Sequence, residues 1–312
     1  MSVDNVLFDR LSNHSFTTYL RAMRLSLVKF SRIHNPGIFK RQVANAHETY
    51  LPISLTWGDN QNVSVNDIFA TDYTDDYGTY DAASKLHKPK VFLIFGSQGS
   101  GKSALAYYLH CQWALEAKEV KNINDFDMAF VFEADKVKSC RDLPDITSVV
   151  NFSFFPKDTT EEEAKRQLLD SKVLWIVDGL DRAPSIAREV VRAWMLVCPR
   201  SQFVITSRWT GMQRMNELFN QLQYSVQTVT MRIRPLSGDT WKQMIPKIVA
   251  ANTRREEIIE ELSSTLIARL DESISSLNAI YPYGIALFVK GWLELKYGYL
   301  EGEKLSHKVL PI

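Results

Sequence analysis

The chain has 312 residues, 45% of them hydrophobic and 23% charged, which is the composition of a globular protein able to bury a large core. Its 37 Lys and Arg residues nearly balance its 36 Asp and Glu residues, so the net charge of +1 gives no global basic field for nucleic acid or a membrane. Three cysteines without a C-x-x-C pair argue against a disulfide framework and favour free thiols in a reducing compartment. With no signal-peptide pattern and no apolar run of ~18 residues, we expect a cytoplasmic protein without a membrane span.

The first 48 residues are predicted to form a helical segment, because Leu20, Met23, Leu27 and Phe30 recur near a 3.6-residue period. Basic residues between them indicate either a solvated helix face or a surface that binds phosphate or a partner. Residues 49–57 alternate and are β-branched, which predicts a strand. Residues 58–88 are rich in Asp, Asn, Gly and Thr, which predicts a loop.

From residue 90 to 232, apolar runs of strand length alternate with helical stretches. One predicted helix covers residues 103–118, and another opens at Thr160, where Glu163 three residues later completes a capping box. The alternation predicts an α/β fold with a parallel sheet covered on both faces. The predicted strands are residues 91–95, 128–133, 173–177, 203–206 and 226–232.

The order of these predicted elements indicates three domains. Residues 1–48 form the helical segment, residues 49–235 an α/β domain, and residues 236–312 a C-terminal helical domain without strand signals.

A glycine-rich stretch follows the first of the apolar strands. Its sequence GSQGSGKS fits G-x-x-x-x-G-K-[ST], with a buried strand before it and a helix predicted to be amphipathic after it. Glycines let successive backbone N–H groups curl around phosphate oxygens, and the positive end of the following helix faces the anion. The predicted phosphate-binding residues are Gly96, Ser97, Gln98, Gly99, Ser100, Gly101, Lys102, Ser103 and Ala104.

Within this loop, Lys102 is predicted to supply positive charge to the β- and γ-phosphates, and Ser103 to offer its hydroxyl to Mg²⁺. A carboxylate for the same metal is expected at Asp178, which ends the apolar run LWIV at the tip of a strand. Asp181 lies one turn further and is predicted to orient or deprotonate the attacking water. Purely structural roles for the two carboxylates remain the alternative.

The third motif is FVITSR, a strand that ends in Thr206, Ser207 and Arg208. An arginine at the tip of a neighbouring strand can sense the γ-phosphate, because its planar fork grips phosphate oxygens at two places. A structural salt bridge is the alternative interpretation of Arg208.

Taken together, GSQGSGKS (96–103), LWIVDGLD (174–181) and FVITSR (203–208) resemble the NACHT group of STAND NTPases, over about residues 45–300. The segment YLPISLTW (50–57) also resembles the lead-in strand of that group. The resemblance implies a P-loop NTPase of three layers, of the AAA+ and STAND type, followed by a small helical domain. It implies that the strand with Arg208 lies between the P-loop strand and the Asp178 strand.

The resemblance also implies what the protein does. Members of the group are nucleotide switches of innate immunity and antiphage defence, so it implies ATP or ADP with Mg²⁺, ATP hydrolysis, and oligomerisation on activation. Residues Lys102, Ser103, Asp178, Asp181 and Arg208 take the roles given above. Pro282, in the segment YPYGIALFV, falls beside the adenine and ribose.

The sequence departs from the group at two points, which change the expected hydrolysis and domain content. Arg182 stands where the group usually has a glutamate after DGxD, and an arginine cannot serve as a base, so slow hydrolysis that rests on Asp181 is expected. The chain also ends at residue 312, which suggests a fragment, a minimal member, or one component of a two-protein system that supplies the sensor or effector.

Other functions remain open from the sequence. A motor ATPase of the AAA+ or helicase type, acting on nucleic acid or protein, is kept open by the basic residues at 21–41, and turnover stimulated by nucleic acid would reveal it. A small-molecule kinase shares the P-loop but not the DGLD and TSR motifs. A scaffold with a vestigial site is favoured by Arg182 and opposed by the intact pair of Lys102 and Ser103.

Overall fold

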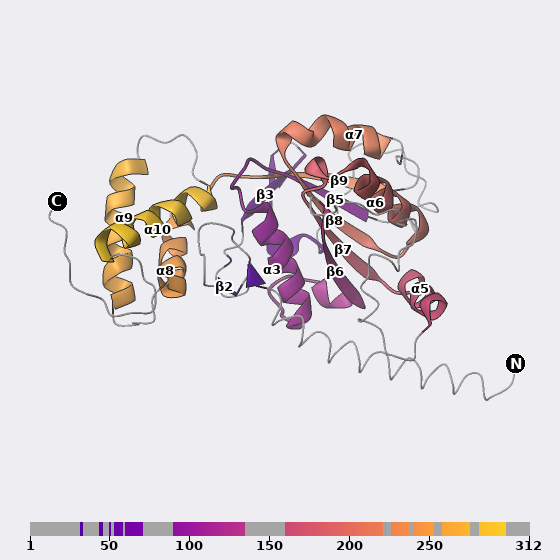
Figure 1. Cartoon of the computed structure of the whole chain (residues 1–312), viewed down its shortest axis with the longest axis horizontal. Helices are drawn as coiled ribbons and strands as arrows, with labels where there is room; N and C mark the ends of the chain where they lie inside the picture. Colours follow the sequence, from indigo (N-terminus) through magenta and orange to yellow (C-terminus); the bar gives the residue numbers. More distant parts are fainter. Residues whose placement is uncertain are drawn as a thin grey trace, which may run out of the picture.

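A computed structural model shows the architecture of the chain (Figure 1). Its described residues are 32–33, 44–45, 50, 53–58, 60–70, 90–134, 160–220, 222, 226–236, 240–252, 258–274 and 281–297. Within them a seven-stranded sheet carries helices on both faces, and three further helices pack beside it (Figure 1).

The sheet has the order β4-β3-β9-β5-β8-β7-β6. Strands β6, β7, β8, β5 and β9 are all parallel, whereas β3 pairs antiparallel with β9 and with β4. The predicted placement of the Arg208 strand, β8, between the P-loop strand β5 and the Asp178 strand β7 is therefore confirmed. The strands are β3 Ser54–Trp57, β4 Gln61–Ser64, β5 Lys90–Phe95, β6 Met128–Glu133, β7 Val173–Asp178, β8 Gln202–Ser207 and β9 Gln227–Ile233.

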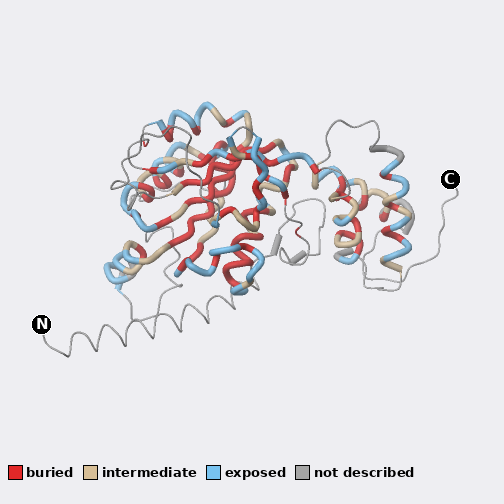
Figure 2. The backbone as a smooth tube through the Cα atoms, turned by 180° about the vertical axis from the view of Figure 1, so that it is seen from behind, coloured by how far each residue is buried: buried red, intermediate tan, exposed pale blue. Residues whose placement is uncertain are grey.

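Each face of the sheet buries its own core, and the central strands β5, β8 and β7 are buried along nearly all of their length (Figure 2). Helix α3 (Lys102–Ala114) covers one face, where Leu105, Leu109 and Trp113 meet alternate residues of the strands. On the other face lie α5 (Glu161–Asp170), α6 (Ser185–Val197) and α7 (Met212–Asn220). This three-layer arrangement is the α/β fold that the alternation of strands and helices predicts.

The last three described helices share a separate core (Figure 1). They are α8 (Thr240–Asn252), α9 (Ile259–Ile274) and α10 (Pro282–Tyr297). In α9, Leu262, Leu266 and Leu270 recur every four residues and are buried against the other two helices, as their helical spacing predicts. The domain boundaries at residues 48 and 235 remain predictions.

The structure corrects four details of the sequence analysis. The sheet is mixed rather than wholly parallel, because β3 and β4 form an antiparallel extension. Part of the predicted loop, Gln61–Ser64, is the strand β4, and residues 71–88 of that loop lie outside the described residues. The predicted helix of residues 103–118 ends at Ala114, and it is buried on nearly all sides rather than amphipathic.

The predicted N-terminal helix lies largely outside the described residues. The four residues that are described, Arg32–Ile33 and Ala44–Asn45, pair as two short antiparallel strands, β1 and β2, so the helical prediction is wrong there. Helix α3 contacts β1.

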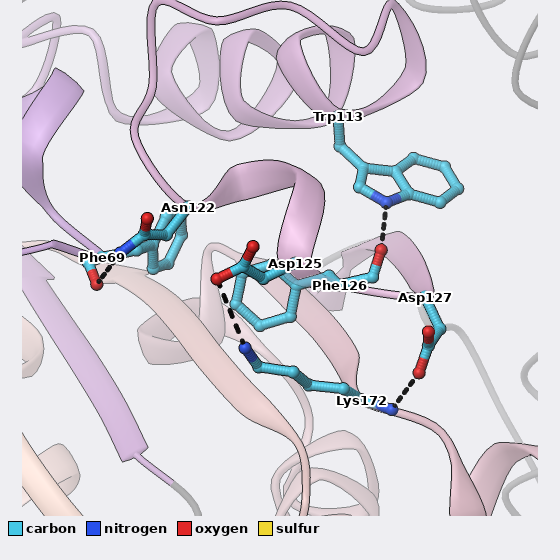
Figure 3. A network of polar contacts seen from close by, with 7 residues as sticks. All are labelled: Phe69, Trp113, Asn122, Asp125, Phe126, Asp127 and Lys172. Carbon is cyan, nitrogen blue, oxygen red and sulfur yellow. Dashed lines mark hydrogen bonds and ion pairs between the residues drawn. The ribbon is translucent and has the colours of Figure 1, made fainter.

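A polar network fastens the edge of the sheet where β6 and β7 begin (Figure 3). The Asp127 carboxylate accepts a hydrogen bond from the Lys172 backbone N–H at 2.7 Å, which aligns the two strands at their starts. The Trp113 indole N–H donates to the Phe126 carbonyl at 3.0 Å and so ties the end of α3 to the same corner. This corner is opposite the strand ends that carry the predicted site, so its contacts serve stability.

None of the helices in the described part of the chain combines the length and the apolar character that a bilayer crossing needs. The two described cysteines, Cys111 and Cys198, are buried free thiols, as predicted.

Candidate nucleotide-binding site

The glycine-rich loop connects the end of β5 to the start of α3. The Gly96 N–H donates a hydrogen bond to the Ser207 carbonyl at 3.1 Å, which joins the loop to the tip of β8. Gly99 and Gly101 have φ values of 76° and 94°, a region that favours glycine. An added Cβ at Gly96 would collide with Ser100 Oγ, so a larger residue there would displace the Ser100 hydroxyl.

Lys102 reaches back into the curve of this loop. Its Nζ donates hydrogen bonds to the carbonyls of Gly96 at 2.9 Å and Ser97 at 2.7 Å. Ser100 Oγ is a third acceptor of this amine, at 3.5 Å. The cation is therefore held by weak neutral acceptors at the position where the loop would receive a phosphate.

Burial and the surrounding charges both shift the pKa of Lys102. Burial lowers the pKa of the Lys102 ammonium to about 8, because the charged form loses hydration. The carboxylates of Asp178 and Asp181 act in the opposite direction and raise this pKa, because negative charge favours the ammonium form. The guanidinium groups of Arg208 and Arg182 add to the lowering of this pKa.

The remaining loop residues occupy the start of α3. Ser103 is exposed in the first helical turn, and Ala104 packs partly buried against the core between α3 and the sheet. Gln98, which precedes α3 in the loop, is exposed. The first helical turn thus leaves the Ser103 hydroxyl accessible to a ligand.

Asp178 is the last residue of β7 and is 8% exposed. Thr206, at the tip of the adjacent strand β8, donates a short hydrogen bond to Asp178 Oδ1. The Thr206 hydroxyl in turn accepts a hydrogen bond from the Gly179 N–H at 3.2 Å. The carboxylate is therefore fixed in direction by a neighbouring strand, as a metal-binding group requires.

Asp181 lies in a single 3-10 turn after β7 and is 6% exposed. Its Oδ1 is buried and has no hydrogen-bond partner within the part of the chain that the structure describes. A Cβ added to Gly211, after β8, would collide with Asp181 Cβ, so the two turns are in close contact. A buried carboxylate oxygen without a donor is costly and suits a site completed by a ligand.

Arg208 follows β8 and is partly buried at the sheet edge that carries Asp178. The next residue, Trp209, stacks on Phe95 of β5 with ring centroids 5.4 Å apart. The Arg232 guanidinium, from the end of β9, lies 4.9 Å above the Trp209 ring. These contacts fix the turn that carries Arg208 against the end of the P-loop strand.

The start of α10 contacts the P-loop. The Tyr283 N–H donates to the Gly99 carbonyl at 3.2 Å, and the Tyr281 hydroxyl donates to Ser97 Oγ at 3.2 Å. A Cβ added at Gly101 would lie 3.7 Å from Pro282 Cγ, so Pro282 also borders the loop. The place of Pro282 beside the adenine and ribose stays a prediction.

The donor set fits a magnesium ion. Mg²⁺ prefers hard oxygen ligands and keeps several waters, so one hydroxyl and one carboxylate suffice beside phosphate oxygens. The Ser103 hydroxyl and the Asp178 carboxylate provide these two groups near Lys102.

The family is decided by a match over half of the chain. Residues 90–252 match the model of the NACHT domain. The chain belongs to the NACHT domain family. This NACHT chain is also 26% identical over 189 residues to the protein NLRC5 of Mus musculus. That match covers 53% of this chain and 9% of NLRC5, so the chain spans a small part of its curated relative.

Matches with solved structures cover about two thirds of this NACHT chain. Domain III of the replication initiation protein DnaA of Thermotoga maritima is 12% identical, with a TM-score of 0.34 over 64% of this chain and 82% of that one. The ORC2 protein of Aeropyrum pernix is 12% identical, with a TM-score of 0.37 over 66% and 63%. A RuvB variant of Thermotoga maritima is 11% identical, with a TM-score of 0.31 over 65% and 62%.

Several polar residues near the NACHT site were not predicted as site residues. Glu133 is the last residue of β6 and the register partner of Asp178. Tyr281 and Tyr283 flank Pro282 and contact the loop directly. The two tyrosines could have been found from the sequence, because an aromatic residue stands on each side of Pro282. Glu133 could not have been found without the strand register.

Proposed function

We propose that this NACHT chain binds ATP with Mg²⁺, hydrolyses it slowly and acts as a nucleotide-dependent switch. The observation that carries the proposal is the convergence of Lys102 with Asp178 and Asp181 at the ends of β5 and β7. Phosphates bind where a glycine loop, a lysine and a helix start meet, and the neighbouring carboxylate suits the metal.

Each site residue has a defined role in this proposal. Lys102 leaves its carbonyl acceptors and pairs with the β- and γ-phosphates, because charged oxygens are stronger acceptors than carbonyls. The Ser103 hydroxyl and the Asp178 carboxylate would hold Mg²⁺, which neutralises phosphate charge when bound. Arg208 would contact the γ-phosphate. Pro282 would border the adenine and ribose.

Hydrolysis would use Asp181 as the acceptor of a proton from water. The water oxygen bonds to the γ-phosphorus, the bond from that phosphorus to the ADP oxygen breaks, and the water proton passes to the Asp181 carboxylate. Arg182 is exposed in the next position and supplies no base. A single buried carboxylate without a neighbouring glutamate supports slow turnover.

The switch would act through α10. The hydrogen bonds of Tyr283 with Gly99 and of Tyr281 with Ser97 connect the helical core directly to the phosphate loop. A ligand that moves the loop must therefore also move or break these contacts, so ATP, ADP and the empty site favour different positions of the three helices.

A nucleotide-retention assay with Lys102→Ala tests the proposal. The full chain should retain labelled ATP in a filter assay, and Lys102→Ala should lose it because the phosphate charge is left unpaired. The matched control is Lys121→Ala, at an exposed lysine that pairs with Asp67. Retention of ATP by Lys102→Ala at the level of Lys121→Ala would refute the assignment.

Steady-state hydrolysis tests the roles of the two neighbouring positions. Asp181→Asn should lower kcat by about 10²-fold or more while ATP binding is kept, because it removes a general base. Arg182→Glu should raise kcat, since it restores a carboxylate at the position that the family usually uses. Unchanged hydrolysis in both variants would refute the roles given to these two positions. Severalfold stimulation of wild-type turnover by DNA or RNA would favour the motor function instead.

We also propose that the chain is cytoplasmic and self-associates, or pairs with a partner protein, in defence or stress sensing. Free buried thiols and the NACHT family support this. Particle mass measured with ATP and with ADP tests it. Identical mass in both nucleotide states would contradict self-association as the output of the switch.

A further inference from the structure

Glu133 extends the row of polar residues at the site edge of the sheet. It ends β6 as Asp178 ends β7, and the two residues are direct partners in the parallel register. Thr206 occupies the same end of β8 and contacts Asp178. Polar side chains therefore follow one another at the ends of three adjacent strands.

Glu133 and Asp178 project from the same face of the sheet. Side chains alternate along a strand, and Ala129 and Val131 of β6 belong to the core beneath α3. Leu174 and Ile176 of β7 belong to that same core. Two residues after Val131 and Ile176, the two carboxylates therefore lie side by side on the α3 face, on strands about 4.8 Å apart.

A side chain of helix α3 forms a hydrogen bond with Glu133. The Tyr107 hydroxyl donates to Glu133 Oε1 at 2.5 Å. Tyr107 lies one helical turn after Ser103, so the two residues share a face of α3. The hydroxyl proposed for Mg²⁺ and the hydroxyl that orients Glu133 thus come from the same side of one helix.

We propose that Glu133 is the second carboxylate of the magnesium site, where it orients water bound to the metal and is itself positioned by Tyr107. This proposal rests on the proposed function. Two adjacent carboxylates repel each other, and a divalent cation offsets that repulsion. Carboxylates that accept hydrogen bonds from metal-bound water, without contacting the metal, also raise the affinity of a site for the metal.

The role differs from that of Asp181. Asp181 belongs to the turn after β7 and packs against Gly211 beyond β8, whereas Glu133 lies on the β6 side of Asp178. Loss of Glu133 should therefore weaken the metal, and loss of Asp181 should slow hydrolysis with the metal still bound.

Manganese binding measured by electron paramagnetic resonance tests the proposal, with Mn²⁺ as the probe and the full chain saturated with ADP. Glu133→Gln should weaken Mn²⁺ binding by about 10- to 100-fold, the range for lost outer-shell partners. ADP affinity in the presence of EDTA should stay within about threefold of wild type, because the phosphate loop is intact. A merely structural role of Glu133 would weaken both.

Two further variants sharpen the result. Tyr107→Phe should weaken Mn²⁺ binding in the same direction by about tenfold or less, because the carboxylate remains but is no longer oriented. Glu217→Gln, on the exposed face of α7, is the matched control and should leave Mn²⁺ affinity unchanged.

The outcomes separate the two proposals. Wild-type protein that binds ADP, with Mn²⁺ affinity in Glu133→Gln equal to that in Glu217→Gln, overturns the role of Glu133 and leaves the proposed function standing. Wild-type protein that binds no nucleotide overturns both.

Discussion

The Thr206 hydroxyl joins the Asp178 carboxylate to the backbone of the residue that follows it. It donates to Asp178 Oδ1 and accepts from the Gly179 N–H at 3.2 Å. Thr206 is fully buried, so water cannot replace either bond. One side chain on β8 therefore satisfies two polar groups at the tip of β7, including the carboxylate proposed for the metal.

Thr206→Val keeps the shape of the side chain and removes both hydrogen bonds. It should lower the free energy of unfolding by about 1–3 kcal/mol, since a buried carboxylate and a buried N–H lose their partner. Thr206→Ser, which keeps the hydroxyl, is the matched control and should be less affected. Urea unfolding of the nucleotide-free full chain measures both, and equal stability of the two variants would contradict the role of this hydroxyl.

The strands that carry the site could be predicted because apolar runs define them. The predicted strand of residues 128–133 coincides with β6, and the capping box of Thr160 and Glu163 is present as predicted. The strand β4 was missed because, of its four residues, only Val63 is buried, so pairing with β3 creates it rather than a hydrophobic pattern. Helix α3 carries no amphipathic pattern because both its sides are buried.

The residues of the site also differ in whether the sequence alone could predict them. The spacing of Gly96, Gly101 and Lys102 is local, so the sequence is sufficient to predict the loop. The partnership of Glu133 with Asp178 depends on strand register, and a slip of one residue would turn Glu133 to the opposite face. Contacts of α10 with the loop join residues nearly two hundred positions apart and leave no local pattern.

The lowered pKa of Lys102 predicts how nucleotide affinity depends on pH. Burial places this pKa at about 8 in place of the ordinary 10.5, so the empty site loses its cation as the pH rises through that value. Bound phosphates favour the charged form, so binding takes up a proton. MgADP affinity should therefore fall, by up to about tenfold per pH unit, from about pH 8 upward.

Isothermal titration with MgADP between about pH 7 and pH 9.5 measures this dependence, a window around the lowered pKa. Lys102→Met should bind weakly and lose the dependence, and Lys121→Met should keep the wild-type profile. Affinity that is constant across the window would contradict the prediction. The folding stability of the nucleotide-free protein depends on pH in the opposite direction. Between about pH 8 and pH 10.5 the unfolded chain holds more protons than the folded chain. The contribution of Lys102 to the free energy of unfolding therefore rises with pH.

Gly99 and Gly284 form a matched pair for the contact between the loop and α10. A Cβ at Gly99, with φ of 76°, would lie 2.7 Å from Tyr283 Cβ, whereas a Cβ at Gly284 has no neighbour within 4 Å. Gly99→Ala should destabilise the chain by about 1–3 kcal/mol and raise hydrogen exchange at the Tyr283 amide. Gly284→Ala should be neutral or stabilising by up to about 1 kcal/mol, since alanine favours helix. Equal exchange at Tyr283 in both variants would show that α10 is not fixed by the loop.

Gly211 allows the turn after β8 to approach Asp181. A Cβ there would collide with Asp181 Cβ and would lie 3.0 Å from Ser207 Oγ, so Gly211→Ala must displace the Asp181 turn. Because a general base contributes about 10²-fold or more only when correctly placed, kcat for ATP should fall strongly while ATP retention is kept. Thr210→Ala, at the exposed neighbouring position, is the control. If Gly211→Ala hydrolyses ATP as fast as Thr210→Ala, the position of Asp181 does not limit turnover, and another group must accept the proton from water.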